Sequence, residues 1–152
     1  MKLIDLCKLV SQRLGEGSTL LDLYPLLDSY DGTEWRDCQK YRFCCQKYAR
    51  HQVYQDDRIQ VLVICWDKQQ QSGVHDHPDN GCLLKLMRGN LVEEVWEIDD
   101  TQRKLVRENH LSPGQISYQE GKSGLHNIIN LSDTGAISLH IYSPPLYTPT
   151  FY

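Results

Sequence analysis

The segment GVHDHPDNGC, residues 73–82, carries two histidines that are one residue apart. In an extended segment, side chains two positions apart point to the same face, so His75 and His77 would converge while Asp76 points away. Converging neutral imidazoles suit a borderline divalent metal ion. The alternative is a pair of surface histidines in a polar loop, and the motif alone leaves both interpretations open. Cys82 stands about where a carboxylate ligand would be expected, so its role is also open.

A third histidine, His126, lies in the apolar segment LHNIINL that follows the turn-like sequence GKSG. A β-barrel brings strands together that are distant in the sequence, so this histidine can meet the other two. Three histidines without a carboxylate would hold a divalent ion and leave coordination positions open for a substrate and dioxygen. The commoner arrangement for non-haem iron has two histidines and one carboxylate.

A row of polar residues occupies one face of the segment AISLHIYSPP, residues 136–145. Ser138, His140 and Tyr142 alternate there with isoleucine and leucine. Such a polar face is either solvated, as on an edge strand, or lines a site. The strongly apolar opposite face favours a site. Side chains at positions i, i+2 and i+4 can then form one hydrogen-bonded row that orients the tyrosine hydroxyl.

The elements that must hold these residues differ along the chain. Within residues 1–40, apolar residues recur at helical spacing, and Gly15 and Gly17 end the first helical segment. Within residues 41–152, short apolar runs alternate with glycine, proline and serine turns, and residues 82–98 predict two strands hinged at Gly89-Asn90. We predict a single domain, a mainly β barrel with N-terminal α-helices packed on it.

Composition excludes several classes of protein. The 152 residues carry a net charge of −4 without a basic run, so we expect no nucleic-acid partner and no membrane partner. No apolar run approaches a membrane span, and the start MKLIDLCKLV does not fit a signal peptide, so we expect a cytoplasmic protein. The six cysteines form no C-x-x-C pair, and we expect most of them to be buried rather than zinc-bound.

Four segments together resemble the cysteine dioxygenase family, whose members are cupin-fold thiol dioxygenases. They are KYARH, HDHPDNGCLLKLMRGNLVEE, LHNIIN and SLHIYSPP. The resemblance covers most of the chain, including Tyr30 and Trp35 of the helical start, and the order and spacing of the motifs make it specific. It implies a cupin-type, jelly-roll-like barrel.

The resemblance implies that His75, His77 and His126 bind one ferrous ion per chain. L-Cysteine would bind this ion through its thiolate and amine, and dioxygen would take the remaining position. Both oxygen atoms would go to sulfur and give cysteine sulfinate, so the resemblance places the protein in cysteine catabolism. This reaction needs no external electron donor, and the chain carries no flavin or nicotinamide fingerprint.

The resemblance also assigns the substrate-facing residues. Arg50 would pair with the substrate carboxylate, for which a planar guanidinium is well suited, and Tyr48 would lie beside it. Tyr142 would place its hydroxyl near the oxygen and the carboxylate, held by His140 and Ser138.

Two covalent features are implied as well. Cys82 and Tyr142 match the positions that the family joins by a thioether, and Ser143-Pro144 matches a cis peptide bond. Family members often continue beyond the Ser-Pro-Pro segment, so we expect this chain to lack the last strands of the barrel or a lid over the pocket.

Two alternatives to a cysteine dioxygenase remain. A sister enzyme would act on 3-mercaptopropionate, against which Arg50 argues, because the resemblance links arginine at that position to cysteine. A cupin that binds a metal without catalysis would give no reason for Arg50, Ser138, His140 and Tyr142 to be placed together. We expect a monomer.

Overall fold

The computed structural model of the protein describes residues 1–41 and 48–152, with side chains outside residues 38–47. The N-terminal part is helical and consists of α1 (Leu3–Gly15), η1 (Leu21–Leu23), α2 (Tyr24–Asp28) and η2 (Glu34–Tyr41). The strands are β1 (Ala49–Gln55), β2 (Gln60–Trp66), β3 (Gly81–Arg88), β4 (Leu91–Asp99), β5 (Gln102–Leu111), β6 (Ile116–Gln119), β7 (Leu125–Ile129) and β8 (Ala136–Ser143). This order confirms the predicted mainly β fold with a helical start.

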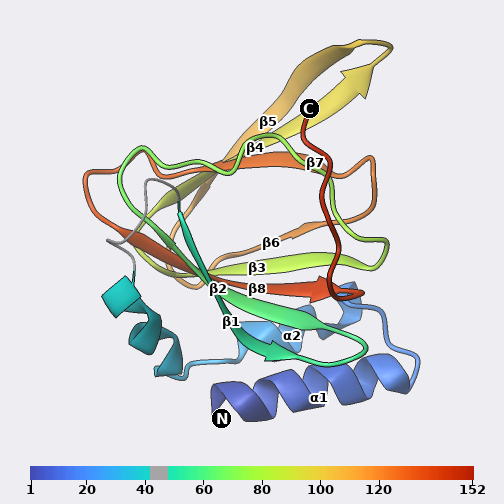
Figure 1. The fold of residues 1–152 in the computed structure, drawn as a ribbon, viewed down its shortest axis with the longest axis vertical. Coiled ribbons are helices and arrows are strands. Elements are labelled where there is room, and N and C mark those ends of the chain that lie inside the picture. Colours follow the sequence, from blue (N-terminus) through green and yellow to red (C-terminus); the bar gives the residue numbers. More distant parts are fainter. Residues whose placement is uncertain (42–47) are drawn as a thin grey trace.

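The strands form two antiparallel sheets (Figure 1). The larger sheet has the order β1-β2-β8-β3-β6, and the smaller has the order β5-β4-β7. A buried apolar cluster joins them, with Leu62, Ile64 and Leu84 from the larger sheet and Leu91 and Ile128 from the smaller. The interior between the sheets is therefore the place where residues of distant strands meet.

Strand β2 shows why the central strands are continuously apolar. Val61, Val63 and Cys65 point to the helices, where they join the cluster that contains Leu6 and Val10 of α1. The alternate residues of β2 point between the sheets. Because both faces are covered, both sets of side chains must be apolar or hydrogen-bonded.

The helices cover the outer face of the larger sheet (Figure 1). A buried lysine, Lys85 of β3, fixes their position, because its Nζ donates to the carbonyl oxygens of Leu27, Asp28 and Tyr30 at 3.0, 2.9 and 2.8 Å. These bonds tie the last turn of α2 and the residues just after it to the sheet. None of the described helices is long and apolar enough to cross a membrane.

The predicted hinge between β3 and β4 is confirmed at Gly89. This residue has φ +81°, and a Cβ there would lie 2.8 Å from the carbonyl oxygen of Gly135. The turn therefore requires glycine both for its backbone conformation and for the close approach of the neighbouring chain.

The cysteines are only partly described. Cys7, Cys65 and Cys82 are buried, as predicted. The side chains of Cys38, Cys44 and Cys45 lie outside the described part of the chain, as does Lys47 of the KYARH segment.

Candidate metal centre and pocket

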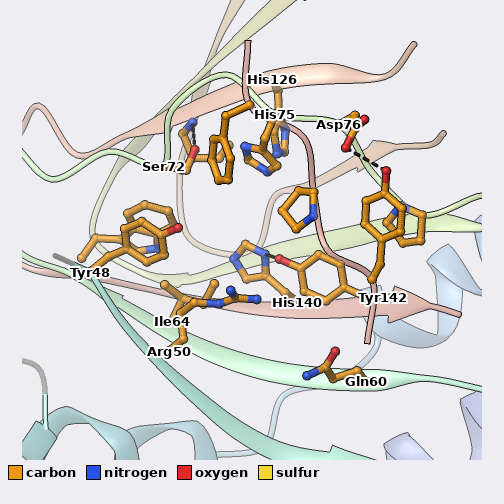
Figure 2. Close-up of a pocket in the computed structure, with 16 residues that line it drawn as sticks. Tyr48, Arg50, Gln60, Ile64, Ser72, His75, Asp76, His126, His140 and Tyr142 are labelled. Atoms are coloured by element: carbon orange, nitrogen blue, oxygen red, sulfur yellow. Dashed lines mark hydrogen bonds between the residues drawn. The ribbon is translucent and has the colours of Figure 1, made fainter. Parts of the chain in front are cut away.

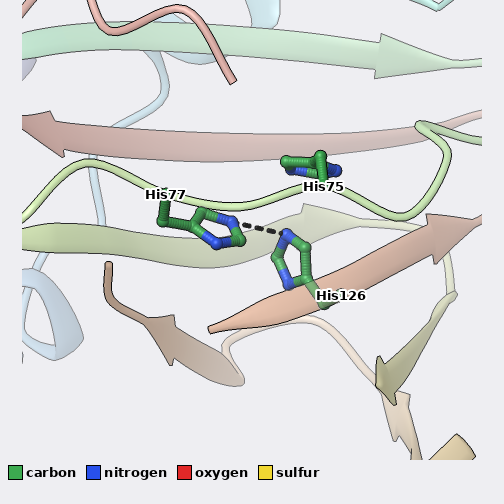
Figure 3. Close-up of side chains that lie close together, drawn as sticks. All are labelled: His75, His77 and His126. Carbon is green, nitrogen blue, oxygen red and sulfur yellow. Dashed lines mark hydrogen bonds between the residues drawn. The ribbon is translucent and has the colours of Figure 1, made fainter. Parts of the chain in front are cut away.

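Three histidines from two distant segments converge between the sheets (Figure 3). The segment that holds His75 and His77 is not a regular strand, but His75 forms an isolated antiparallel bridge with His126 of β7. The two backbone hydrogen bonds of this bridge measure 3.1 and 3.3 Å. One potential ligand atom of each histidine lies within 4.8 Å of those of the other two, and Nε2 of His77 is 3.0 Å from Nε2 of His126.

The other ring nitrogen of each histidine is held by an oxygen. Nδ1 of His75 lies 2.8 Å from the carbonyl of Gly73, and Nδ1 of His77 lies 2.6 Å from the carbonyl of Gly124. Nδ1 of His126 lies 2.8 Å from the Glu93 carboxylate. These oxygens only accept, so each Nδ1 carries the proton and each Nε2 of a neutral ring offers its lone pair. Such outer partners orient histidine ligands in metal sites.

The environment keeps His75 and His77 neutral. Burial, followed by the neighbouring His126, lowers the pKa of His75 to about 4 and the pKa of His77 to about 2. Two bare Nε2 atoms 3.0 Å apart repel each other unless a cation or a proton lies between them. The donor set therefore fits a divalent metal ion, whose binding would displace that proton.

Glu93 of β4 is a residue at the histidine cluster that the sequence analysis did not identify. Its carboxylate is 2% exposed and accepts from His126, from the Ser117 hydroxyl and from Asn109 Nδ2 at 3.0 Å. Burial alone would raise the pKa of Glu93, but the hydrogen bonds and the charge of His126 outweigh it and lower this pKa to about 2. The sequence does carry a sign of its position. Glu93 is two residues from both Leu91 and Val95, so in a strand its carboxylate lies on the same face as these buried apolar side chains.

Ser138, His140 and Tyr142 lie in one hydrogen-bonded row on β8. Ser138 Oγ is 2.7 Å from His140 Nε2, and the Tyr142 hydroxyl is 3.3 Å from His140 Nδ1. Trp66 of β2 extends the row, since its Nε1 donates to Ser138 Oγ at 2.9 Å. Burial, followed by the positive charges of His126 and Arg50, lowers the pKa of His140 well below its usual value, so this ring is neutral.

Cys82 lies directly across from Tyr142 in the pairing of β3 with β8. Opposed residues of an antiparallel pair bring their Cβ atoms to about 5 Å, and a hydrogen bond joins these two side chains. Burial raises the pKa of both the thiol and the phenol, so both are protonated. Among the described residues, the cluster of potential metal ligands contains the three histidines and not Cys82.

A cavity of about 50 Å³ opens beside the histidines (Figure 2). Its polar wall includes His75, His126, His140 and Tyr142. Arg50 lines it as well, and its side chain points toward His140. This volume holds a few water molecules or one small substrate.

Tyr48 is placed in the same pocket by an aromatic stack. Its ring lies 4.5 Å from that of Trp66 between centroids, with an angle of 25° between the planes. Tyr48 and Arg50, the two residues that the resemblance assigned to the substrate, thus lie on the same side of the pocket as the Ser138–Tyr142 row.

The residues that follow β8 cover the pocket. Ser143-Pro144 is a cis peptide bond, and Tyr147, Pro149 and Phe151 line the cavity. The segment after β8 therefore covers part of the pocket, and the expectation of a short C-terminus stays a prediction. The buried carboxylate of Asp76 binds this segment instead of facing solvent.

Solved structures with a similar fold identify the structural class of this protein. The two facing sheets resemble TT1209 from Thermus thermophilus, with a TM-score of 0.60 and 21% identity over 76% of this chain and 98% of that chain. They also resemble a protein with a double-stranded β-helix domain from Klebsiella pneumoniae, with a TM-score of 0.57 and 17% identity over 69% of this chain and 84% of that one. At these identities the likeness shows the fold alone, which is of the cupin type.

Sequence comparison then gives the family. The family described as "Cysteine dioxygenase type I" matches residues 5–152. Human "Cysteine dioxygenase type 1" is 32% identical over 154 residues, which cover 96% of this chain and 76% of the human protein. The chain therefore belongs to the cysteine dioxygenase family, and the resemblance found in its motifs is confirmed.

Proposed function

We propose that the protein is an iron-dependent dioxygenase that converts the thiol of L-cysteine to cysteine sulfinate. The observation that carries this proposal is that a three-histidine centre, a guanidinium and an oriented tyrosine line one small cavity in a chain of this family. The reaction balances without a further reductant. Sulfur gives up four electrons, dioxygen takes up four, and both oxygen atoms end on sulfur.

His75, His77 and His126 would hold one ferrous ion through their Nε2 atoms. Bound there, the ion would supply the redox chemistry that lets dioxygen react with a thiol. Three neutral ligands leave the positive charge of the ion uncompensated, and this charge favours the thiolate form of the substrate. Glu93 would keep the ring of His126 in the orientation and tautomer that binding requires.

Arg50 would pair with the carboxylate of the substrate. Its guanidinium reaches the cavity from β1, and a planar fork binds a carboxylate through two parallel hydrogen bonds. Tyr48, stacked on Trp66, would limit the movement of the substrate on that side.

Tyr142 would direct its hydroxyl into the cavity. The neutral His140 and Ser138 hold the phenol in place through the hydrogen bonds of the row. The phenol proton is thus available at Oη to the oxygen atoms of the reaction and to the substrate carboxylate.

The opposed positions of Cys82 and Tyr142 support a thioether between Sγ and the phenol ring. Its formation would break the S–H bond and one ring C–H bond and form one S–C bond. The two electrons and two protons released would pass to dioxygen. The crosslink would fix the phenol beside the metal, so Cys82 would be neither a ligand nor a nucleophile.

A thiol panel tests the proposed substrate. The protein is loaded with ferrous iron without air, mixed with one thiol and exposed to dioxygen, and oxygen uptake is measured together with the products by mass spectrometry. We expect L-cysteine to give sulfinate with the highest kcat/KM. A higher kcat/KM for 3-mercaptopropionate would refute the cysteine assignment, and iron binding without any oxidised thiol would indicate a cupin that is not an enzyme.

A further inference from the structure

The segment formed by residues 147–152 is built as a roof over the pocket. Tyr147, Pro149 and Phe151 alternate along it and line the cavity, with 57% of Phe151 still exposed, and Thr148 and Thr150 between them are exposed. The ring of Phe151 lies 5.7 Å from the ring of His75 between centroids. Side chains of an extended segment alternate between its faces, so one face of this segment belongs to the site.

Asp76 provides the hydrogen-bond acceptors that hold this roof. Its carboxylate is 2% exposed, although it lies between two histidines of the metal centre. Oδ1 accepts from the Tyr147 hydroxyl and the Thr150 amide, both at 2.8 Å, and Oδ2 accepts from the Tyr152 hydroxyl at 3.3 Å. Figure 2 shows one of these bonds as a dashed line at Asp76. Hydrogen bonds to an ionised carboxylate are among the stronger ones in proteins.

The backbone adds a second set of contacts along the same line. The amide of Asp76 donates to the carbonyl of Thr150 at 3.1 Å, and the amide of Tyr152 donates to the carbonyl of Val74 at 2.9 Å. Between these bonds, His75 and Phe151 form an isolated bridge. Gly73, which precedes this line of contacts, has φ +85°, a backbone conformation that favours glycine.

We propose that Asp76 is a positioning residue whose hold on residues 147–152 restricts the pocket to small thiols. The His-Asp-His motif would then serve two purposes, with the histidines facing the metal and the aspartate facing the roof. This inference rests on the proposed function, since it names what limits the substrate of the same site. Without the anchor, the roof face of Tyr147, Pro149 and Phe151 no longer has a fixed distance from the histidines.

Substrate selectivity tests the effect of the roof. L-Cysteine is compared with L-homocysteine, which adds one methylene and keeps the thiol, amine and carboxylate. In Asp76→Asn and in Phe151→Ala we expect the ratio of kcat/KM for homocysteine over cysteine to rise about tenfold, the discrimination that one methylene gives in a fitted pocket. Thr148→Ala, on the exposed face, leaves the ratio unchanged. An unchanged ratio in both pocket variants would overturn the proposal, even if their activity or stability fell.

Hydrogen exchange tests the anchor without catalysis. In the metal-free protein we expect the amides of Thr150 and Tyr152 to exchange about tenfold faster in Asp76→Asn than in the wild type, since a bond to a charged acceptor is lost. Unchanged exchange would overturn the anchoring role. If Asp76→Asn does not fold, the double variant Tyr147→Phe, Tyr152→Phe removes two of the three donors and gives the same comparison. A wild type that oxidises no thiol would refute the proposed function, while the exchange result would still decide on the anchor.

Discussion

At the scale of single residues, the metal centre depends on what lies behind each histidine. Carbonyl oxygens of Gly73 and Gly124 fix two of the rings, whereas His126 is fixed by a carboxylate. Every residue has a backbone carbonyl, so those two contacts do not depend on a particular side chain. The contact to His126 requires a carboxylate at position 93, which points inward from β4. Replacement of Glu93 therefore probes the centre without removing a ligand.

We expect Glu93→Gln to weaken metal binding by about 10- to 100-fold, because the neutral amide holds the His126 ring less firmly. Titration with cobalt or ferrous iron under chelator competition measures the affinity. Glu94→Gln is the matched control, since this neighbour faces the other way and bonds to Asn127 instead of a ligand. Equal metal affinity of Glu93→Gln and the wild type would remove Glu93 from the centre.

Arg50 lies at the edge of the pocket and is exposed, so its contribution is that of a partly solvated charge. We expect Arg50→Ala to raise KM for L-cysteine roughly tenfold, near the lower end for a hydrogen bond between charged groups. Steady-state oxygen uptake gives KM, and cysteamine, which lacks the carboxylate, is the control thiol. A normal KM for L-cysteine would refute the pairing.

At the scale of elements, the central strands of the larger sheet have two different faces. One face is apolar and packs under the helices, and the other carries the polar residues of the site. In β8 the alternate residues Ile137, Leu139 and Ile141 join the cluster under the helices, while the polar row points between the sheets. Pairing of β8 with β3 sets Tyr142 opposite Cys82, and pairing with β2 brings Trp66 to Ser138. The register of these strands therefore decides which side chains can react or bond.

The register gives a prediction about Cys82. Cys82→Ser keeps the size of the side chain but cannot form the thioether, so we expect an active enzyme whose kcat is lower by on the order of tenfold, since the phenol is less well fixed. Intact mass should show a loss of two hydrogens in the wild type and none in the variant. Complete inactivity with the metal still bound would mean that Cys82 acts more directly than through a crosslink.

Much of this arrangement could be predicted from the sequence, because it rests on local patterns. Alternation predicted β8 and its polar row, and Gly89 predicted the hinge after β3. Glu93 was missed because its partner His126 is 33 residues away and only the pairing of β4 with β7 brings them together. The anchoring of the C-terminal segment was missed for the same reason, since Asp76 and its partner Tyr147 are 71 residues apart.

At the scale of the whole molecule, the polar residues of the site are buried next to two apolar clusters, one under the helices and one between the sheets. The helices cover the outer face of the larger sheet (Figure 1). The cavity lies between the sheets, and residues 147–152 cover it. Keeping the imidazoles of His75 and His77 neutral in this position links the stability of the fold to pH.

We expect the metal-free protein to lose stability as the pH falls from about 6.5 to about 4. The pKa of His75 is 6.5 in its ordinary state and about 4 in the fold, so between these values the unfolded chain binds more protons and the free energy of unfolding rises with pH. The full contribution, on the order of 3 kcal/mol, is present above pH 6.5.

Urea unfolding at pH 7 and pH 5, in the presence of a chelator, measures this effect. His75→Gln should reduce the difference between the two pH values, whereas His110→Gln, at an exposed position, should not. An equal pH dependence in the His75 variant and the wild type would contradict the assignment.

The central claim is that a three-histidine centre transfers both atoms of dioxygen to one thiol. It is tested most directly by a single turnover of the iron-loaded protein with L-cysteine under ¹⁸O₂, with mass analysis of the product. The account predicts cysteine sulfinate in which both sulfur-bound oxygens carry the label, and no such product from His126→Ala. Sulfinate with one labelled oxygen, or no sulfinate from the iron-loaded wild type, would contradict it.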